Sequence, residues 1–283
     1  MPTIAAGARI ALYAKPGHPQ APRLAEELAG WLAARGYDPV ADAPADPAPA
    51  LAVVLGGDGS VLHAARRLAP ACTPIFAVHL GTLGFLAETA AGDLYPSLEA
   101  ILAGRGHRQR RALVRVRVLR PAGGEGSAER EVAVLDALNE VVVGKASAAR
   151  IVQLDLAVGG ETVARYRADG VLVATPTGST AYSFSAGGPV LHPALPALVI
   201  TPVCPHALNQ RPLVVPASAE VALHLRAAES ACLTLDGQQV LSLEPGDRVL
   251  CMASPLALDL VTAAPPRFYA HLRAKLHWGG EHK

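Results

Sequence analysis

The period of the hydrophobic pattern changes near Arg111, and this change most constrains how the chain can fold. Before it, short apolar runs alternate with segments whose apolar residues recur at helical spacing. After it, apolar residues take alternate positions, as in the runs 112–118 and 152–158. The pattern predicts an α/β domain with a Rossmann-like parallel sheet, followed by an all-β sandwich domain. We place these domains at residues 1–110 and 111–264.

Individual elements follow from the same pattern. The run Leu51–Leu55 is short and apolar throughout, which is typical of a buried parallel strand. A helix capped by Ser60 should follow it, and a short C-terminal helix within 265–283 is expected to pack back on the first domain. Other strands are expected at Arg9–Ala14, Pro74–Val78, Val132–Leu135, Val171–Ala174, Val221–Leu225, Leu233–Leu235 and Leu256–Val261. Other helices are expected around Leu24–Leu32 and Leu94–Leu102, with an exposed hairpin loop at 121–130.

Composition excludes several classes of protein. Lys plus Arg is 25 and Asp plus Glu is 24, a formal charge of +1, so we expect no nucleic-acid partner bound through a basic surface. We find no run of about 20 apolar residues free of proline and charge, and therefore expect no membrane partner. The N-terminus has no basic segment before its first apolar run, so a cytoplasmic protein is the expectation.

The four cysteines are Cys72, Cys204, Cys232 and Cys251. They lie far apart in the sequence and form no CxxC pair. We expect buried reduced thiols, and neither a disulfide set nor a protein metal site.

A glycine loop, Gly56–Ser60, follows the apolar run Leu51–Leu55 directly. Glycines let the backbone turn sharply, and the N-terminus of the next helix offers free N–H groups to a phosphate. Asp58 would repel a phosphate beside it, so it fits a group that takes a proton or holds a metal. A tight turn with Asp58 as a helix cap explains the loop equally well. The loop matches neither GxGxxG nor the P-loop pattern.

Two further segments offer polar side chains at strand ends. Residues 176–189 are dense in hydroxyl groups, more than local turns need, and Tyr182 can stack on a base. Asn139 and Glu140 precede an apolar triplet; the pair can clamp a ribose diol or simply form a turn.

Together these segments resemble the bacterial type of the ATP-dependent NAD kinase family. The resemblance implies phosphoryl transfer from ATP to the 2′-hydroxyl of the adenosine ribose of NAD, with a divalent cation, Mg²⁺, accompanying ATP. It also implies an active site between two domains and a homodimer or homotetramer. The matching pieces, in the family's order, are LGGDGSVLHAAR (55–66), LGTLGFL (80–86), LNEVVV (138–143), DGVLVATPTGSTAYSFSAGGPV (169–190), TPVCPHALNQRPLVV (201–215) and DGQ (236–238).

The resemblance also implies roles for single residues. Asp58 matches the family's catalytic base, while Gly57 and Gly59 match the glycines of the phosphate loop. His63 could touch a phosphate, although a lone histidine on a helix is more often exposed or packed. Arg167 lies where a basic residue accompanies a preference for NAD over NADH, and we expect it to act by fixing Asp169. The substrate contacts implied are Asn139, Glu140, Arg150, Arg167, Asp169, Thr180, Ala181, Tyr182, Ser185 and Gln238.

Two other functions remain open from the sequence. A lipid or sugar kinase can share the GGDG turn, and a non-catalytic NAD sensor can share the pocket. Retention of Asp58 argues against a sensor, and the segment 176–189 argues for a nucleotide-like acceptor.

Overall fold

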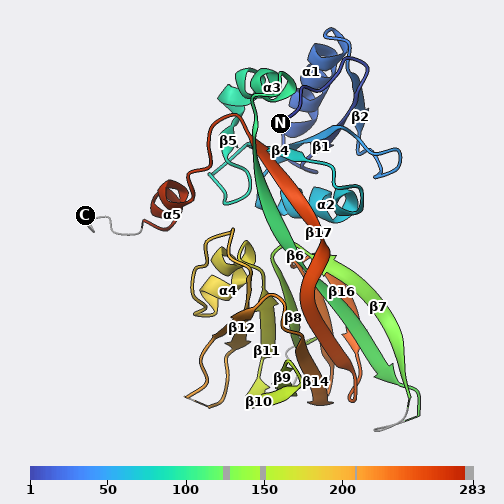
Figure 1. Ribbon diagram of the computed structural model, residues 1–283, viewed down its shortest axis with the longest axis vertical. Helices are drawn as coiled ribbons and strands as arrows, with labels where there is room; N and C mark the ends of the chain where they lie inside the picture. Colours follow the sequence, from blue (N-terminus) through green and yellow to red (C-terminus); the bar gives the residue numbers. More distant parts are fainter. Residues whose placement is uncertain (124–127, 147–150, 208, 278–283) are drawn as a thin grey trace. The chain divides into compact units, whose positions relative to one another are not determined.

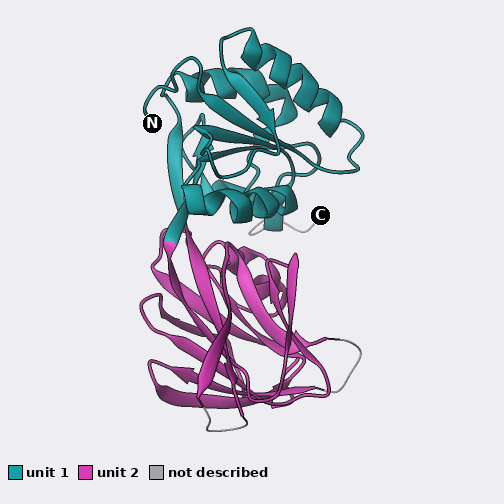
Figure 2. Cartoon of the chain, turned by 90° about the vertical axis from the view of Figure 1, so that its right-hand side faces the viewer, with its two compact units in different colours: residues 1–111, 256–283 teal, residues 112–255 magenta. Residues whose placement is uncertain are grey.

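The structure is a computed structural model that describes residues 1–123, 128–146, 151–207 and 209–277. It divides the chain into two compact units, shown in Figure 2. Unit 1 comprises residues 1–111 and 256–283, and unit 2 comprises residues 112–255. Two long strands, β6 (His107–Pro121) and β17 (Arg248–Thr262), contribute residues to both units.

Unit 1 contains a parallel sheet. Each of its main neighbouring strands pairs in parallel, and all six residues of β3 are buried. Buried on both faces, β3 is apolar throughout except for its final glycine, as a central parallel strand should be. The order is β17, β4 (Ile75–His79), β3 (Leu51–Gly56), β1 (Arg9–Ala14) and β2 (Asp38–Ala41), with β5 (Thr89–Ala90) also paired to β4.

Helices cover both faces of this sheet (Figure 1). On one face, α1 (Ala21–Ala33) and α3 (Leu94–Leu102) pack apolar side chains against β1 and β3. On the other, α2 (Asp58–Leu68) buries Val61, Leu62, Ala65 and Leu68 at helical spacing. Two short 3₁₀ turns, η1 (Ala69–Ala71) and η2 (Ala91–Asp93), flank these helices.

One expectation about a helix in unit 1 can be checked directly. The expectation that Ser60 caps α2 was wrong: the N-cap is Gly57, and Ser60 lies inside the helix. The helix therefore starts three residues earlier than expected, at Asp58. The C-terminal helix α5 (Phe268–Leu276) belongs to unit 1, where Lys275 Nζ donates to the carbonyl of Leu83 at 2.7 Å.

Unit 2 is a sandwich of two antiparallel sheets. The first sheet uses the unit 2 parts of β6 and β17 with β7 (Glu129–Ala137), β9 (Val152–Val158), β10 (Glu161–Ala168) and β14 (Val221–Ala227). The second has the order β13 (Leu213–Pro216), β12 (Ala197–Val203), β11 (Gly170–Ala174), β8 (Glu140–Lys145), β15 (Ala231–Leu235) and β16 (Gln239–Leu243).

The core of unit 2 lies between its two sheets. Val114, Val116 and Val118 of β6 share it with Val141 and Val143 of β8. Ala112, which the alternation assigned to the same face, is exposed instead. The parallel α/β unit and the all-β sandwich confirm the predicted fold class.

Because side chains alternate along a strand, the inward position of Val141 and Val143 turns Glu140, Val142 and Gly144 outward. Part of this outer face is covered by the 3₁₀ turn η3 (Gly178–Thr180) and the one-turn helix α4 (Tyr182–Ser185). The uncovered part holds the pocket described below. Within the described residues, no helix is long and apolar enough to cross a membrane.

Candidate active site

The glycine loop of unit 1 connects β3 to α2. Gly57 has an extended backbone (φ −123°, ψ −169°), and Asp58 begins the helix. Gly56 is required by packing, because an added Cβ would overlap the Ser60 hydroxyl. At Gly57 and Gly59 an added Cβ would meet open space, so these glycines leave room beside the helix N-terminus. The N-terminus of a helix attracts anions.

The Asp58 carboxylate is held by a neighbouring loop. It accepts hydrogen bonds from the backbone N–H groups of Phe85 (2.8 Å), Leu86 (3.0 Å) and Ala87 (3.1 Å). Gly84 permits this approach, since a Cβ there would overlap Oδ1 of Asp58. The carboxylate therefore has a fixed position, and the LGTLGFLA segment is fixed to the glycine loop.

Two basic side chains near this loop differ in position. Lys15 follows β1 at the same edge of the sheet, and a Cβ on Gly56 would lie 3.1 Å from the Lys15 Cβ. The sequence reading did not single out Lys15, although its place directly after a parallel strand was a usable signal. His63 is exposed on α2, more than one turn beyond Asp58.

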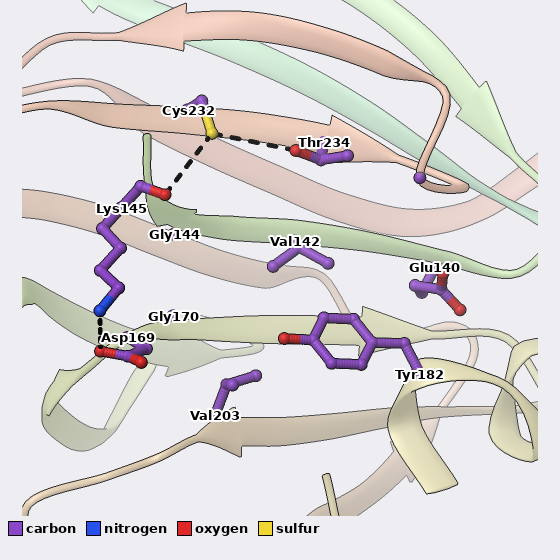
Figure 3. Close-up of a pocket in the computed structure, with 11 residues that line it drawn as sticks. Glu140, Val142, Gly144, Lys145, Asp169, Gly170, Tyr182, Val203, Cys232 and Thr234 are labelled. Carbon is purple, nitrogen blue, oxygen red and sulfur yellow. Dashed lines mark hydrogen bonds and ion pairs between the residues drawn. The ribbon is translucent and has the colours of Figure 1, made fainter. Parts of the chain in front are cut away.

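Unit 2 has a pocket of about 330 Å³ on the outer face of its second sheet (Figure 3). Glu140 lies at one end, the Lys145–Asp169 ion pair lies at the other, and the Tyr182 ring lies between them. The remaining lining residues are Val142, Gly144, Gly170, Val203, Cys232, Thr234 and Gly237.

Asn139 and Glu140 are buried beside this pocket with unsatisfied oxygen atoms. Their exposed fractions are 8% and 6%, and neither Asn139 Oδ1 nor Glu140 Oε2 has a hydrogen-bond partner. Burial, together with the nearby charge of Asp236, raises the pKa of Glu140 to about 7, while the Tyr182 backbone N–H opposes the rise. Leaving buried polar atoms unpaired costs about 1–3 kcal/mol each, so these atoms are suited to a polar ligand.

The Lys145–Asp169 pair corrects one expectation. Arg167 was expected to fix Asp169, but Arg167 is exposed on β10, and the ion pair that the structure gives Asp169 is with Lys145, at 2.8 Å. Lys145 was missed because it ends an apolar strand with no motif around it. Arg150 lies outside the described residues.

Part of the hydroxyl-rich segment is used by local structure. Ser179 donates to the carbonyl of Pro176 at 2.6 Å, and Ser183 bonds Thr201 at 3.0 Å. Thr180 donates to the carbonyl of Thr177 at 3.2 Å. Local structure therefore uses three of the hydroxyls in this segment, those of Ser179, Thr180 and Ser183.

Other residues singled out by sequence differ in how they face the pocket. Tyr182 is 44% exposed and lines the pocket, and burial raises the pKa of its phenol. Ala181 is half-buried and Ser185 exposed beside it, outside the pocket lining. Gln238 is exposed in the turn after β15, where its neighbour Gly237 lines the pocket.

The cysteine expectation holds only in part. All four cysteines are free thiols. Cys251 is buried, and burial raises the pKa of its thiol to about 12. Cys72 and Cys204 are exposed, contrary to the expectation, and both lie at left-handed backbone positions where the chain turns at the surface.

Two domain families match the chain. The ATP-NAD kinase N-terminal domain matches residues 39–106, and the ATP-NAD kinase C-terminal domain matches residues 138–263. The NAD kinase of Koribacter versatilis is 41% identical over 287 residues, which covers 95% of this chain and 98% of that protein. The NAD kinase of Acidobacterium capsulatum is 41% identical over 289 residues, with 96% and 99% covered.

Solved structures are similar as well. An NAD kinase from Archaeoglobus fulgidus in complex with ATP has a TM-score of 0.71 and 25% identity, and the match covers 95% of this chain and 98% of that one. Yeast NADH kinase complexed with NADH has a TM-score of 0.85 over 99% of this chain and 90% of that one. Its identity of 23% makes this a likeness of fold alone.

Proposed function

Because this chain belongs to the ATP-NAD kinase family, we propose the following roles for its residues in phosphoryl transfer from ATP to NAD. The activity itself follows from the relatives: the chain is a phosphotransferase that transfers the γ-phosphoryl group of ATP to the 2′-hydroxyl of the adenosine ribose of NAD. The resemblance read from the sequence is confirmed.

The observation that best supports an acceptor site in unit 2 is the pair of buried, unpartnered oxygens of Asn139 and Glu140. A ribose diol offers two hydroxyl donors to such oxygens. The adjacent Tyr182 ring presents an apolar face on which a base can stack. The proposed substrate contacts are Asn139, Glu140, Arg150, Arg167, Asp169, Thr180, Ala181, Tyr182, Ser185 and Gln238.

Unit 1 supplies the phosphate-binding features. Gly57, Gly59 and the N-terminus of α2 receive phosphate oxygens, because the loop is open there and a helix N-terminus attracts anions. Lys15 adds a positive charge at the same strand edge. His63 lies more than one turn further along α2, and the one role proposed for it is an outer phosphate contact.

Asp58 is the proposed general base. A carboxylate has about four acceptor positions, and the three N–H groups of residues 85–87 take two on Oδ1 and one on Oδ2. One position on Oδ2 remains for the proton of the attacking hydroxyl. Its fixed orientation suits a base, since general-base catalysis depends on geometry before pKa.

The divalent cation is proposed to enter with ATP. Among the described residues, no group of three His, Cys, Asp or Glu side chains could hold a metal ion. Mg²⁺ in phosphoryl-transfer enzymes keeps several waters and is bound through substrate phosphates and one or two carboxylates. Bound in this way, it would neutralise phosphate charge, and the chain need not supply a cage for it.

The remaining assignments rest on the family resemblance. We assign the protein to the cytoplasm as a homodimer or homotetramer, with NAD and ATP as its substrates. Incubation with ATP, Mg²⁺ and each of NAD, diacylglycerol and fructose 6-phosphate tests the acceptor. Formation of NADP alone is expected, whereas NAD binding without turnover would indicate a sensor.

A further inference from the structure

The turn between β15 and β16 has an unusual backbone. Asp236 and Gly237 both have positive φ (50° and 64°), and the N–H of Gln238 donates to the carbonyl of Leu235 at 2.9 Å. Asp-Gly with both residues left-handed is typical of a type I′ hairpin turn. For a non-glycine residue this conformation is uncommon. It places the Asp236 side chain over the start of β8.

The Asp236 carboxylate there receives three backbone hydrogen bonds. Oδ2 accepts from the N–H of Leu138 (2.9 Å), and Oδ1 accepts from those of Asn139 (2.7 Å) and Glu140 (3.1 Å). The Asp236 N–H in turn donates to the carbonyl of Glu140 at 3.0 Å. One side chain thus holds every N–H of the segment that contains the proposed acceptor-binding pair.

The carbonyl groups of the same segment are held from the other side. Thr175 donates its N–H to the carbonyl of Asn139 (2.8 Å) and its hydroxyl to that of Leu138 (2.6 Å). Gly178 packs so closely that a Cβ there would overlap the Asn139 carbonyl. The backbone of residues 138–140 is therefore fixed, and the unpartnered oxygens of Asn139 and Glu140 are left for a ligand.

Asp236 is also a negative charge close to a second, buried carboxyl. Three donated hydrogen bonds stabilise the ionised form of a carboxylate, and a like charge nearby disfavours ionisation of its neighbour. The other titratable groups around Glu140 are the Tyr182 phenol on α4, Cys232 on β15, and the Lys145–Asp169 pair. That pair lies at the opposite end of the pocket and has opposite charges, whereas the negative charge of Asp236 raises the pKa of Glu140.

Resting on the proposed function, in which Glu140 binds the ribose hydroxyls, we propose that Asp236 is a positioning residue of the acceptor site. It fixes the Leu138–Glu140 backbone and sets the pH range in which Glu140 can accept hydrogen bonds from both hydroxyls. Burial and Asp236 together bring the pKa of Glu140 to about 7. Affinity for NAD should therefore rise with pH through a midpoint near neutrality.

The test is the affinity for NAD, measured by calorimetry without ATP from pH 5.5 to 8.5, in the wild type and in Asp236→Asn. Asparagine suits the left-handed turn and keeps one oxygen for two of the three N–H groups, but it removes the charge. We expect affinity at pH 8 to fall about tenfold, which equals about 1.4 kcal/mol. The midpoint should move to lower pH by about one unit or more. A purely structural role predicts the same loss at every pH, with the midpoint unchanged, and that result would overturn the proposal.

Two control variants make the result specific. Asp155→Asn removes an ionised carboxylate that pairs with Arg165 and Arg226 on the other sheet of unit 2. It should leave the midpoint in place, and a shift equal to that of Asp236→Asn would show a general charge effect and reject the proposal. Glu140→Gln should abolish the pH dependence. Should Asp236→Asn fail to fold, a pH dependence that persists in Glu140→Gln would reject the proposal by itself.

The experiment measures NAD binding and not NADP formation. The role of Asp236 and the assigned activity can therefore fail independently. A wild-type protein that binds NAD with the expected midpoint but makes no NADP would contradict the proposed function and leave the role of Asp236 standing. If the wild type makes NADP but Asp236→Asn keeps the wild-type midpoint, the proposed function stands and the role of Asp236 is rejected.

Discussion

Replacing Glu140 with glutamine should make the free protein more stable at alkaline pH while weakening its binding of NAD. Glu140 is 6% exposed, one of its oxygens is unpartnered, and its pKa is raised from 4.5 to about 7, first by burial and then by Asp236. Ionised Glu140 therefore destabilises the folded state, and it does so in the free protein at physiological pH.

Proton linkage gives the direction in which the free energy of unfolding changes with pH. The unfolded chain releases this proton near pH 4.5 and the folded protein near pH 7, so between these values the folded state binds more protons. The free energy of unfolding then falls as pH rises. The rise from 4.5 to about 7 corresponds to about 3 kcal/mol in total, since one pKa unit is worth about 1.4 kcal/mol. Most of it, roughly 2–3 kcal/mol, appears between pH 5 and pH 8.

The assay is urea unfolding of the wild type and Glu140→Gln at pH 5 and pH 8. The stability of the variant relative to the wild type should be greater at pH 8 than at pH 5 by roughly 2–3 kcal/mol. Any fixed cost of burying the amide cancels in this double difference. Equal relative stabilities at the two pH values would refute the reasoning, because Glu140 would then titrate alike in the folded and unfolded states.

Four other variants test single roles. Asp58→Asn should lower kcat by about 10²–10⁴-fold with little change in NAD affinity, because the amide cannot take the proton; near-normal kcat in a folded variant would remove Asp58 as the base. Tyr182→Ala should weaken NAD binding by about 1–3 kcal/mol in calorimetry if a base stacks on the ring, and unchanged affinity would leave the ring a packing role. Lys15→Ala should raise KM for ATP and leave KM for NAD alone, whereas an equal rise in both would argue against a phosphate contact. Lys145→Met should change the ratio of kcat/KM for NAD to that for NADH more than Arg167→Gly does, since Asp169 pairs with Lys145; the opposite order would return the role to Arg167.

The sequence predicted the fold class because hydrophobic period reports directly on burial. The strand Arg9–Ala14 and the helix Leu94–Leu102 were predicted at their observed bounds, since each has a clear apolar pattern. The helix expected within 265–283 is observed at Phe268–Leu276. The strands β2 and β13 were missed: each has four residues and none or one of them is buried, so they show no apolar signal. Short edge strands form by pairing with a neighbour, which a single sequence window does not show.

The candidate site was less predictable, because its key contacts join residues far apart in the chain. The hydrogen bonds between Asp58 and residues 85–87 span 27 to 29 positions, and those between Asp236 and residues 138–140 span 96 to 98. Motif reading found Asp58 and the pair Asn139-Glu140. The motifs did not reveal the backbone hydrogen bonds that fix these residues, because every residue except proline has a backbone N–H and none is distinctive in sequence. Lys145 was missed because it lies far from Asp169 in the sequence, and only the fold brings the two side chains together.

The proposed reaction is tested most directly by the product that the purified protein forms from NAD, ATP and Mg²⁺. Phosphorus NMR gives the position of the new phosphate. We expect NADP with the phosphate on the 2′-hydroxyl of the adenosine ribose, and no such product from Asp58→Asn in the same time. Transfer to another hydroxyl, or phosphorylation of diacylglycerol or fructose 6-phosphate with NAD unchanged, would contradict it.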